Sequence, residues 1–368
     1  MNIPDMNEVR EKEERLRKAL EASGYQAAVI ARADNFAWIT GGGDSRVIAS
    51  SEIGFSYILY TLDKKYVISL VADIYKVMDE ELEGLGYIPV ILKWFEKTKE
   101  QAVAEKITGM KTVSDILIEG ADFNPGFFYK LHYPLTRQEI EKCRLLGKMT
   151  EEIITQAALK TRPGMTEYQV AALLAGMYAE HDISISVMIV GSDERISKYR
   201  HCMPSSKQIE KVLLLSPAVR KWGLHANVAR MVCFGKVPED ISRKYSAVCD
   251  IEAEAITMCT PGTRFSDILE KQKNLYKQWG FPNEWHNHFQ GGATGYVVSD
   301  PGLCMDKANQ VQACQTYDWF ITITGTKGEE LSINSDGNIE VLSVNGLWPC
   351  NNYTKNGISI KLPEIMQI

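Results

Sequence analysis

The hydrophobic positions of the first 133 residues fall in short runs separated by amphipathic stretches. Residues 6–22 carry apolar side chains at helical spacing among many charges, and Gly24 follows them, which predicts a surface helix. The segment 34–44, DNFAWITGGGD, is interpreted as a turn into a Gly-rich loop without the spacing of a phosphate-binding loop. The remaining pattern predicts a strand at 27–30, a hairpin of 55–61 and 65–70, a helix at 72–84, a strand at 87–92 and a weaker helix at 102–107. Mixed elements of this kind indicate an α/β domain.

The pattern changes at Pro134, where a long amphipathic helix begins. Thr136 and Glu139 have the spacing of a capping box, in which each side chain binds the other residue's backbone N–H. Apolar side chains then recur at helical spacing as far as Lys160. We therefore expect two domains, 1–133 and 134–368, which the length of the chain also favours.

A sequence pattern recurs within the second domain. RPGMT at 162–166 precedes a predicted helix at 167–181, and TPGTR at 260–264 precedes another at 265–280. Each motif follows a long helix and is followed by strand-like sequence. This is the pattern of a duplicated αβ half-domain. Pro-Gly is also a common helix break, so a chance repeat remains the alternative.

Two apolar runs, 212–215 and 228–234, flank Trp222 and Gly223 and predict a β-hairpin with one buried face. Titratable and cationic side chains lie on or beside this hairpin at the density expected of a substrate pocket. They are His201, Lys207, Arg220, His225 and Arg230. The alternative is a core hairpin with solvated charges at its rims.

Composition narrows the range of partners. The formal net charge is −6, with acids and bases interspersed, which argues against a nucleic-acid or anionic-membrane partner. No stretch approaches the ~20 apolar residues of a membrane-spanning helix, and the charged N-terminus is unlike a signal peptide. We therefore expect a cytoplasmic protein whose 8 scattered cysteines are reduced thiols.

A set of motifs is spread in order along nearly the whole chain: NFAWITG at 35–41, the segment 136–166 ending in KTRPGMT, His201, Phe234–Lys236 and Glu329. Their order and spacing resemble the superfamily of creatinase, aminopeptidase P, prolidase and methionine aminopeptidase (M24-like proteins). The resemblance implies an α/β (α+β) protein, with a creatinase-type N-terminal domain and a C-terminal pita-bread domain. In the pita-bread domain two αβ halves are related by a pseudo-twofold axis, in agreement with the internal repeat.

That superfamily usually implies a dinuclear metal site with two Asp, one His and two Glu ligands, and this sequence departs from it. Of the five positions only Glu329 keeps its ligand. The positions that have lost theirs are Ser216, Asn227, Gly292 and Phe320. Two hard divalent cations need several anionic oxygens, and a shifted carboxylate such as Asp318 or Glu330 would change this only slightly. We therefore expect no metal at this site and no other cofactor.

The first functional hypothesis is a metal-independent hydrolase of the creatinase type, acting on a C–N bond of a small peptide or amino-acid derivative. By resemblance, His201 is the general acid and base, His288 a second pocket histidine, and Glu329 a carboxylate that orients water or holds a cationic group. Cationic and aromatic side chains would bind the substrate. They are Arg220, Arg230, Lys327, Lys207 and Trp222. Creatine is not the expected substrate, because the two carboxylates that creatinase uses would fall near Ala229 and Phe320.

Three segments resemble a branch labelled Xaa-Pro aminopeptidase-like: VRKWGL at 219–224, HFQGG at 288–292 and ITGTKGEE at 323–330. That label rests on fold. Phe289 and Phe320 replace a histidine and a polar residue of the branch, which makes the pocket more apolar. The second hypothesis is therefore a non-catalytic module that binds a peptide or small molecule. The architecture also implies a homodimer.

His286 and His288 flank Asn287. On a strand their imidazoles would share one face, at a spacing suited to a metal ion. The sequence places no third ligand beside them, so two polar strand residues are the favoured interpretation of this pair.

Overall fold

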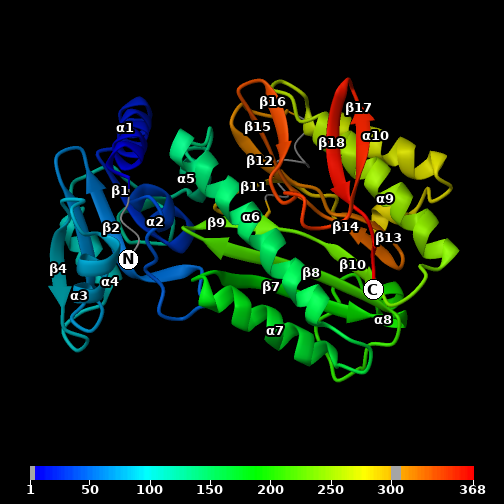
Figure 1. Cartoon of the computed structure of the whole chain (residues 1–368). Coiled ribbons are helices and arrows are strands. Elements are labelled where there is room, and N and C mark those ends of the chain that lie inside the picture. The colour runs from blue at the N-terminus through cyan, green and yellow to red at the C-terminus, as the bar shows by residue number, and fades with distance from the viewer. Residues whose placement is uncertain (1–4, 300–307) are drawn as a thin grey trace. The chain divides into compact units, whose positions relative to one another are not determined.

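The structure is a computed structural model, and it describes residues 5–299 and 308–368 (Figure 1). Contacts within the chain divide it into two compact units. The first unit is Met1–Glu139 with Trp222–Leu224, and the second is Ile140–Lys221 with His225–Ile368. Among the helices of the described residues, none is both long enough and apolar enough to cross a membrane.

A six-stranded sheet forms the core of the first unit. The elements are α1 (Met6–Ser23), β1 (Ala27–Arg32), α2 (Ala33–Thr40), β2 (Ile53–Thr61), β3 (Lys65–Leu70), α3 (Ile74–Lys76), the π-helical turn η1 (Val77–Glu81), β4 (Ile88–Leu92), α4 (Lys99–Lys106), β5 (Thr112–Ser114), β6 (Ala121–Phe123) and α5 (Pro125–Tyr129). The strand order is β4-β3-β2-β1-β5-β6. The central strand β1 is apolar nearly throughout, because both of its faces are covered. The predicted hairpin is confirmed as β2 paired antiparallel with β3.

The interpretation of segment 34–44 as a turn into a loop is wrong for the first half of the segment, which forms helix α2. All residues of this helix are buried, and it ends at Gly41, whose φ of 72° is left-handed. The polar side chains of this helix, Asp34, Asn35 and Thr40, are buried with the apolar ones and hydrogen-bonded inside the protein, so the helix lacks the solvent-exposed polar face by which surface helices are recognised. The run of glycines that follows the helix favoured the prediction of a loop.

The second unit contains helices and several smaller sheets. Its elements are α6 (Arg137–Lys160), α7 (Glu167–Glu180), β7 (Ser184–Ser192), α8 (Glu194–Lys198), β8 (Val212–Lys221), β9 (Leu224–Asn227), β10 (Arg230–Cys233), α9 (Glu239–Thr257), α10 (Phe265–Gln278), the 3-10 turn η2 (Glu284–Asn287), β11 (Gly292–Thr294), β12 (Gln315–Asp318), β13 (Ile321–Ile323), β14 (Thr326–Gly328), β15 (Leu331–Ser335), β16 (Asn338–Val341), β17 (Cys350–Lys355), β18 (Ile358–Pro363) and β19 (Met366–Gln367). One sheet has the order β19-β10-β8-β7, with β9 paired to β8, and another has the order β11-β12-β15-β16.

Two local predictions for this region are confirmed. The capping box at the start of α6 is present: the Thr136 N–H donates to Glu139 Oε2 at 2.6 Å, and the Glu139 N–H donates to Thr136 Oγ1 at 3.2 Å. The predicted hairpin also forms, since β8 pairs antiparallel with β10. Its turn contains Trp222 and Gly223, both with positive φ, which matches the twist of a tight hairpin.

The internal repeat extends to backbone hydrogen bonds. The Gly164 N–H donates to the Ile209 carbonyl at 2.9 Å, and the Gly262 N–H donates to the Val311 carbonyl at the same distance. A single bridge then joins Thr166 to Gln208 in the first copy, and an equivalent bridge joins Arg264 to Gln310 in the second. Chance recurrence of a Pro-Gly turn would not reproduce these paired contacts, so they support duplication of an αβ half.

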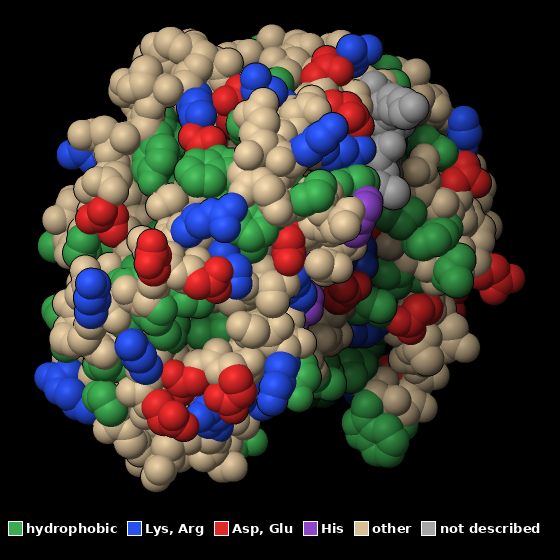
Figure 2. Space-filling model, turned by 90° about the vertical axis from the view of Figure 1, so that its right-hand side faces the viewer, with side chains coloured by type: hydrophobic (Ala, Val, Ile, Leu, Met, Phe, Trp, Pro, Cys, Tyr) green, Lys and Arg blue, Asp and Glu red, His purple; other side chains and the backbone are tan. Residues whose placement is uncertain are grey.

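Acidic and basic side chains are interspersed on the face shown in Figure 2, without an extended area of one sign. This face of the protein offers no strong field to a polyanion.

Candidate active site

A cavity of about 360 Å³ in the second unit gathers most of the side chains singled out in the sequence. Ser216 of β8, Asn227 of β9 and Lys327 of β14 reach it from three strands, and Glu329 follows β14 directly. The imidazoles of His201 and His288 and the ring of Phe320 also line it. Apolar side chains complete the wall: Val187, Ile189, Ala218 and Val298.

An ammonium group lies at the centre of the polar side of this cavity. Lys327 Nζ is 2.6 Å from Glu329 Oε2 and donates to Ser216 Oγ at 2.8 Å. The Ser216 hydroxyl in turn donates to Glu329 Oε2 at 2.8 Å. Lys327 and Glu329 are only 5% and 4% exposed, respectively. Charges buried to this extent persist only when they are paired and hydrogen-bonded, so the three side chains form one unit.

The two histidines form a hydrogen-bonded pair with an assignable direction. His288 Nδ1 is 2.5 Å from the carbonyl oxygen of Phe289, and a carbonyl can only accept, so Nδ1 carries a proton. In a neutral ring, Nε2 of His288 is then the acceptor. It lies 3.2 Å from His201 Nε2, which therefore donates. The hydrogen-bond network thus assigns the protonated nitrogen of each ring.

The surroundings of His288 favour its neutral form. Burial lowers the pKa of His288, and the nearby positive charge of Lys327 acts in the same direction. Phe320 meets the imidazole edge-on, with ring centroids 5.8 Å apart. An uncharged His288 acts as a permanent acceptor for His201 rather than as a second cation in the cavity.

Asn227 connects the cavity to a buried carboxyl group. Its Nδ2 donates to the Val298 carbonyl at 2.9 Å and also to Asp318 Oδ2. Asp318 is completely buried, and burial, reinforced by the charge of Glu329, raises its pKa well above the usual value. Burial therefore disfavours the ionised form of Asp318 next to the site.

The residues at the five metal-ligand positions do not fit a dinuclear metal centre. Gly292 offers no side chain and pairs with Asp318 in the β11–β12 ladder. Phe320 presents a ring, and the one remaining carboxylate, Glu329, is already paired with Lys327. Among the described residues there is no group of three or more His, Cys, Asp or Glu side chains that could hold a metal ion. This donor set lacks the anionic oxygens that two divalent cations require.

Four of the predicted substrate-binding residues do not line the cavity within the described chain. Arg230 is fully buried, where it forms an ion pair with Glu330 and donates a hydrogen bond to the Ser343 carbonyl at 2.7 Å. Lys207 forms ion pairs with three acidic side chains: Asp193, Glu194 and Glu210. Arg220 is buried near the end of β8, and Trp222 lies in the hairpin turn. His225, noted beside the same hairpin, is 2.9 Å from the Gly295 carbonyl through Nδ1.

The histidine pair at 286 and 288 does not lie on a strand. Residues 284–287 form the 3-10 turn η2, and the ring of His286 packs against Trp285 with centroids 4.0 Å apart. Only His288 enters the candidate site.

The role of Ser216 in the site was not predicted from the sequence, where this residue was identified only as the position of a lost metal ligand. Its hydroxyl joins both members of the ion pair. The signal was a lone hydroxyl inside the otherwise apolar run VLLLSPAV of a buried strand. A buried hydroxyl needs a partner, and the sequence could not say which one lies across the sheet.

Comparisons with known proteins agree with this fold. The model of metallopeptidase family M24 matches residues 141–314, in agreement with the predicted superfamily. Matches to solved structures extend over the whole chain and confirm the predicted fold class. A search of curated protein sequences finds no significant match.

The solved structures show how far the M24-type fold extends. Xaa-Pro dipeptidase from Bacillus anthracis superposes with a TM-score of 0.75 at 17% identity, covering 98% of this chain and 100% of the dipeptidase. X-Pro aminopeptidase from Thermotoga maritima MSB8 gives 0.74 at 15% identity, over 97% and 99%. The N-terminal domain of FACT complex subunit SPT16 from chickpea gives 0.67 at 11% identity, over 93% and 98%. At these identities the likeness establishes the fold.

Proposed function

We propose that this M24-type protein is a metal-independent hydrolase that cleaves a C–N bond of a small peptide or amino-acid derivative. The observation that carries the proposal is the ammonium group of Lys327, held by Glu329 and Ser216 in the cavity that His201 and His288 also line. A fixed positive charge beside a proton-transferring imidazole is the minimum that acyl transfer to water requires.

His201 is the proposed general base and acid. Its Nε2–H points at His288, so Nδ1 of the neutral ring is the atom that accepts a proton from the attacking water. Water oxygen bonds to the carbonyl carbon, the C–N bond breaks, and the same proton passes to the leaving nitrogen. Neutral His288 stabilises the transient imidazolium through its acceptor nitrogen.

Lys327 is the proposed oxyanion-binding group. Two of its three N–H bonds are directed at Glu329 and Ser216 among the described residues, which leaves the third for a substrate oxygen. Glu329 pairs with the ammonium group in its buried position. The apolar wall that includes Val187, Ile189 and Phe320 favours a compact, uncharged side chain on the substrate.

The alternative is a non-catalytic binding module. The cavity has little free charge, because Phe320 is apolar, burial disfavours the ionised form of Asp318, and Glu329 is paired with Lys327. The same fold also occurs in the N-terminal domain of FACT complex subunit SPT16, and the name of that protein refers to no peptidase activity. A binding module would hold the ligand without turnover, so activity separates the two hypotheses.

The test is hydrolysis of Xaa-Pro dipeptides and N-acyl amino acids by chelator-treated protein, with metal content measured on the same sample. We expect turnover without metal, reduced by at least ~100-fold in Lys327→Met, the loss typical of removing one oxyanion donor. His201→Ala should reduce it to a similar extent. The matched control is Lys244→Met, which removes a surface ion pair with Asp240 on α9. Binding without turnover would favour the module, and turnover that requires metal would reject the proposal.

A further inference from the structure

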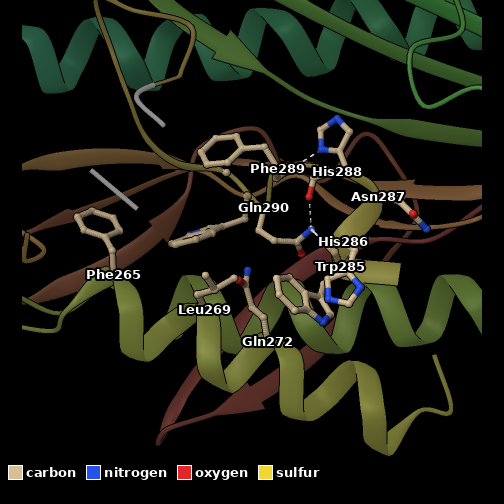
Figure 3. A pocket seen from close by; sticks show the side chains of 11 residues that line it. Phe265, Leu269, Gln272, Trp285, His286, Asn287, His288, Phe289 and Gln290 are labelled. Atoms are coloured by element: carbon tan, nitrogen blue, oxygen red, sulfur yellow. Dashed lines mark hydrogen bonds between the residues drawn. The ribbon is translucent and has the colours of Figure 1, made fainter. Parts of the chain in front are cut away.

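A second cavity, about 550 Å³ in volume, lies between helix α10 and the segment that carries His288 (Figure 3). Phe265, Leu269 and Gln272 are spaced four and three residues apart, so α10 presents them on one face, towards the cavity. Trp285 and Phe289 supply aromatic walls from the other side. This cavity is separate from the proposed catalytic cavity, although His288 lines both.

The wall of this second cavity is firmly held. Gln290 Nε2 donates to the carbonyls of Trp285 and His288, at 3.2 and 2.8 Å, and Figure 3 shows the Gln290 amide turned towards that backbone. Lys273 Nζ lies 4.4 Å from the centroid of the Trp285 ring. A wall braced in this way keeps its shape without a ligand, as preformed binding sites do.

Unpaired polar atoms line this apolar space. Gln272 is fully buried, yet neither its Nε2 nor its Oε1 has a hydrogen-bond partner among the described residues. The indole Nε1 of Trp319, also buried and lining the cavity, is unpaired in the same part of the chain. Buried polar groups are nearly always paired, so the donor and the acceptor of this amide call for a partner beyond the described residues, which a ligand in the cavity would supply.

The lining also determines the charge of that partner. Among the described residues, the cavity wall contains no Lys, Arg, Asp or Glu. A charged ligand would have to leave water without compensation, which is unfavourable. A neutral group that both donates and accepts, such as an amide edge, matches both atoms of Gln272 at once.

We propose that this cavity is a binding site for a small uncharged molecule that combines a flat apolar ring with an amide. The ring packs between the aromatic walls and the amide pairs with the side-chain amide of Gln272. The site is distinct from the proposed catalytic function and does not depend on it.

The experiment uses the full chain and benzamide as the probe, with toluene and benzoate as the matched molecules that lack the amide and add a charge. Binding is measured by calorimetry and by saturation-transfer NMR. We expect benzamide to bind at least tenfold more tightly than either control. Gln272→Leu should weaken benzamide at least tenfold while leaving toluene unchanged, because only the amide pairing is lost.

Two further variants keep the result interpretable. Ser216→Ala changes the catalytic cavity and should leave benzamide binding unchanged, which locates the probe. If Gln272→Leu does not fold, Gln272→Glu is measured in its place, and we expect that variant to lose benzamide binding as well. Equal affinity for benzamide and toluene, or undiminished benzamide binding by the Gln272 variant, would overturn the proposal and indicate that water alone pairs with this amide.

Discussion

Lys327 and Glu329 are nearly inaccessible to solvent and form an ion pair there. Ser216 adds a hydrogen bond to both side chains, and a buried ion pair of this kind depends on both of its members. Removing one partner leaves an uncompensated charge, whereas removing both leaves a neutral pocket of similar volume. Stability and the proposed chemistry therefore depend on the same three side chains.

This dependence can be measured with a double-mutant cycle. Lys327→Met should destabilise the protein by about 3–5 kcal/mol, because it leaves the Glu329 carboxylate buried and unpaired. Adding Glu329→Gln should restore much of that loss. The measurement is urea unfolding of the two single variants and the double variant. Strictly additive effects would contradict a coupled pair.

His132 in the first unit is a second residue whose ionisation matters. Its Nε2 lies 2.9 Å from Asn35 Oδ1, and Asn35 Nδ2 donates to Asp115 Oδ2 at 2.9 Å. Burial lowers the pKa of His132 to about 4 and raises the pKa of Asp115 to about 6. The charged groups that face His132 are Asp34, Glu139, Lys12 and Arg15.

The two shifts act on stability in opposite directions with pH. For His132 the unfolded chain binds the proton first, so stability is lost as the pH falls from about 6.5 to about 4, by roughly 3 kcal/mol. For Asp115 stability is lost as the pH rises through about 6. His132→Gln keeps the donor to Asn35 but cannot titrate. We expect the difference in unfolding free energy between wild type and variant to change by roughly this amount between pH 7 and pH 4. Parallel curves would contradict this.

At the scale of elements, the segment 288–291 positions His288 through its contact with β12. A Cβ at Gly291, where φ is 89°, would lie 2.2 Å from the Asp318 carbonyl oxygen and 2.7 Å from the Phe320 nitrogen. Both atoms belong to the backbone and cannot swing aside. The close approach of two backbones therefore fixes where His288 enters the cavity.

Gly291→Ala should consequently destabilise the protein by several kcal/mol, more than the ~1–3 kcal/mol of backbone strain alone. The matched control is Gly164→Ala, where φ is 87° but a Cβ would meet nothing within 4 Å. Thermal unfolding of both variants measures the difference. Equal losses of stability would show that the contact with β12 is unimportant.

The elements differ in how well the sequence predicted them. The capping box of α6 and the hairpin of β8 and β10 depend on residues close in sequence or on long apolar runs, and both were predicted. Helix α2 was not, because it is buried on every side and its polar side chains mark no solvent-exposed face. For the site, resemblance brought His201, His288, Lys327 and Glu329 together. The partner of Arg230, Glu330, lies 100 residues further along the chain, so the sequence could not place it.

At the scale of the whole molecule, the M24-type fold surrounds a site whose donor set does not suit the family's metals. An ion present at 100 times its Kd would stabilise a protein by ~2.7 kcal/mol. We expect the melting temperature to be the same after chelator treatment and after addition of Mn²⁺ or Co²⁺. Differential scanning calorimetry tests this, and a rise of several degrees with either ion would show that a metal site exists.

A positive charge that belongs to a lysine differs from a metal ion in one respect beyond electrostatics. Lys327 is joined to the chain by covalent bonds, so its charge cannot dissociate, exchange with another element or change oxidation state. In the proposed metal-independent function, the cavity acquires its charge balance when the chain folds and needs no delivery or loading step afterwards. The readiness of such a site is then set by protein synthesis and folding rather than by the supply of trace elements.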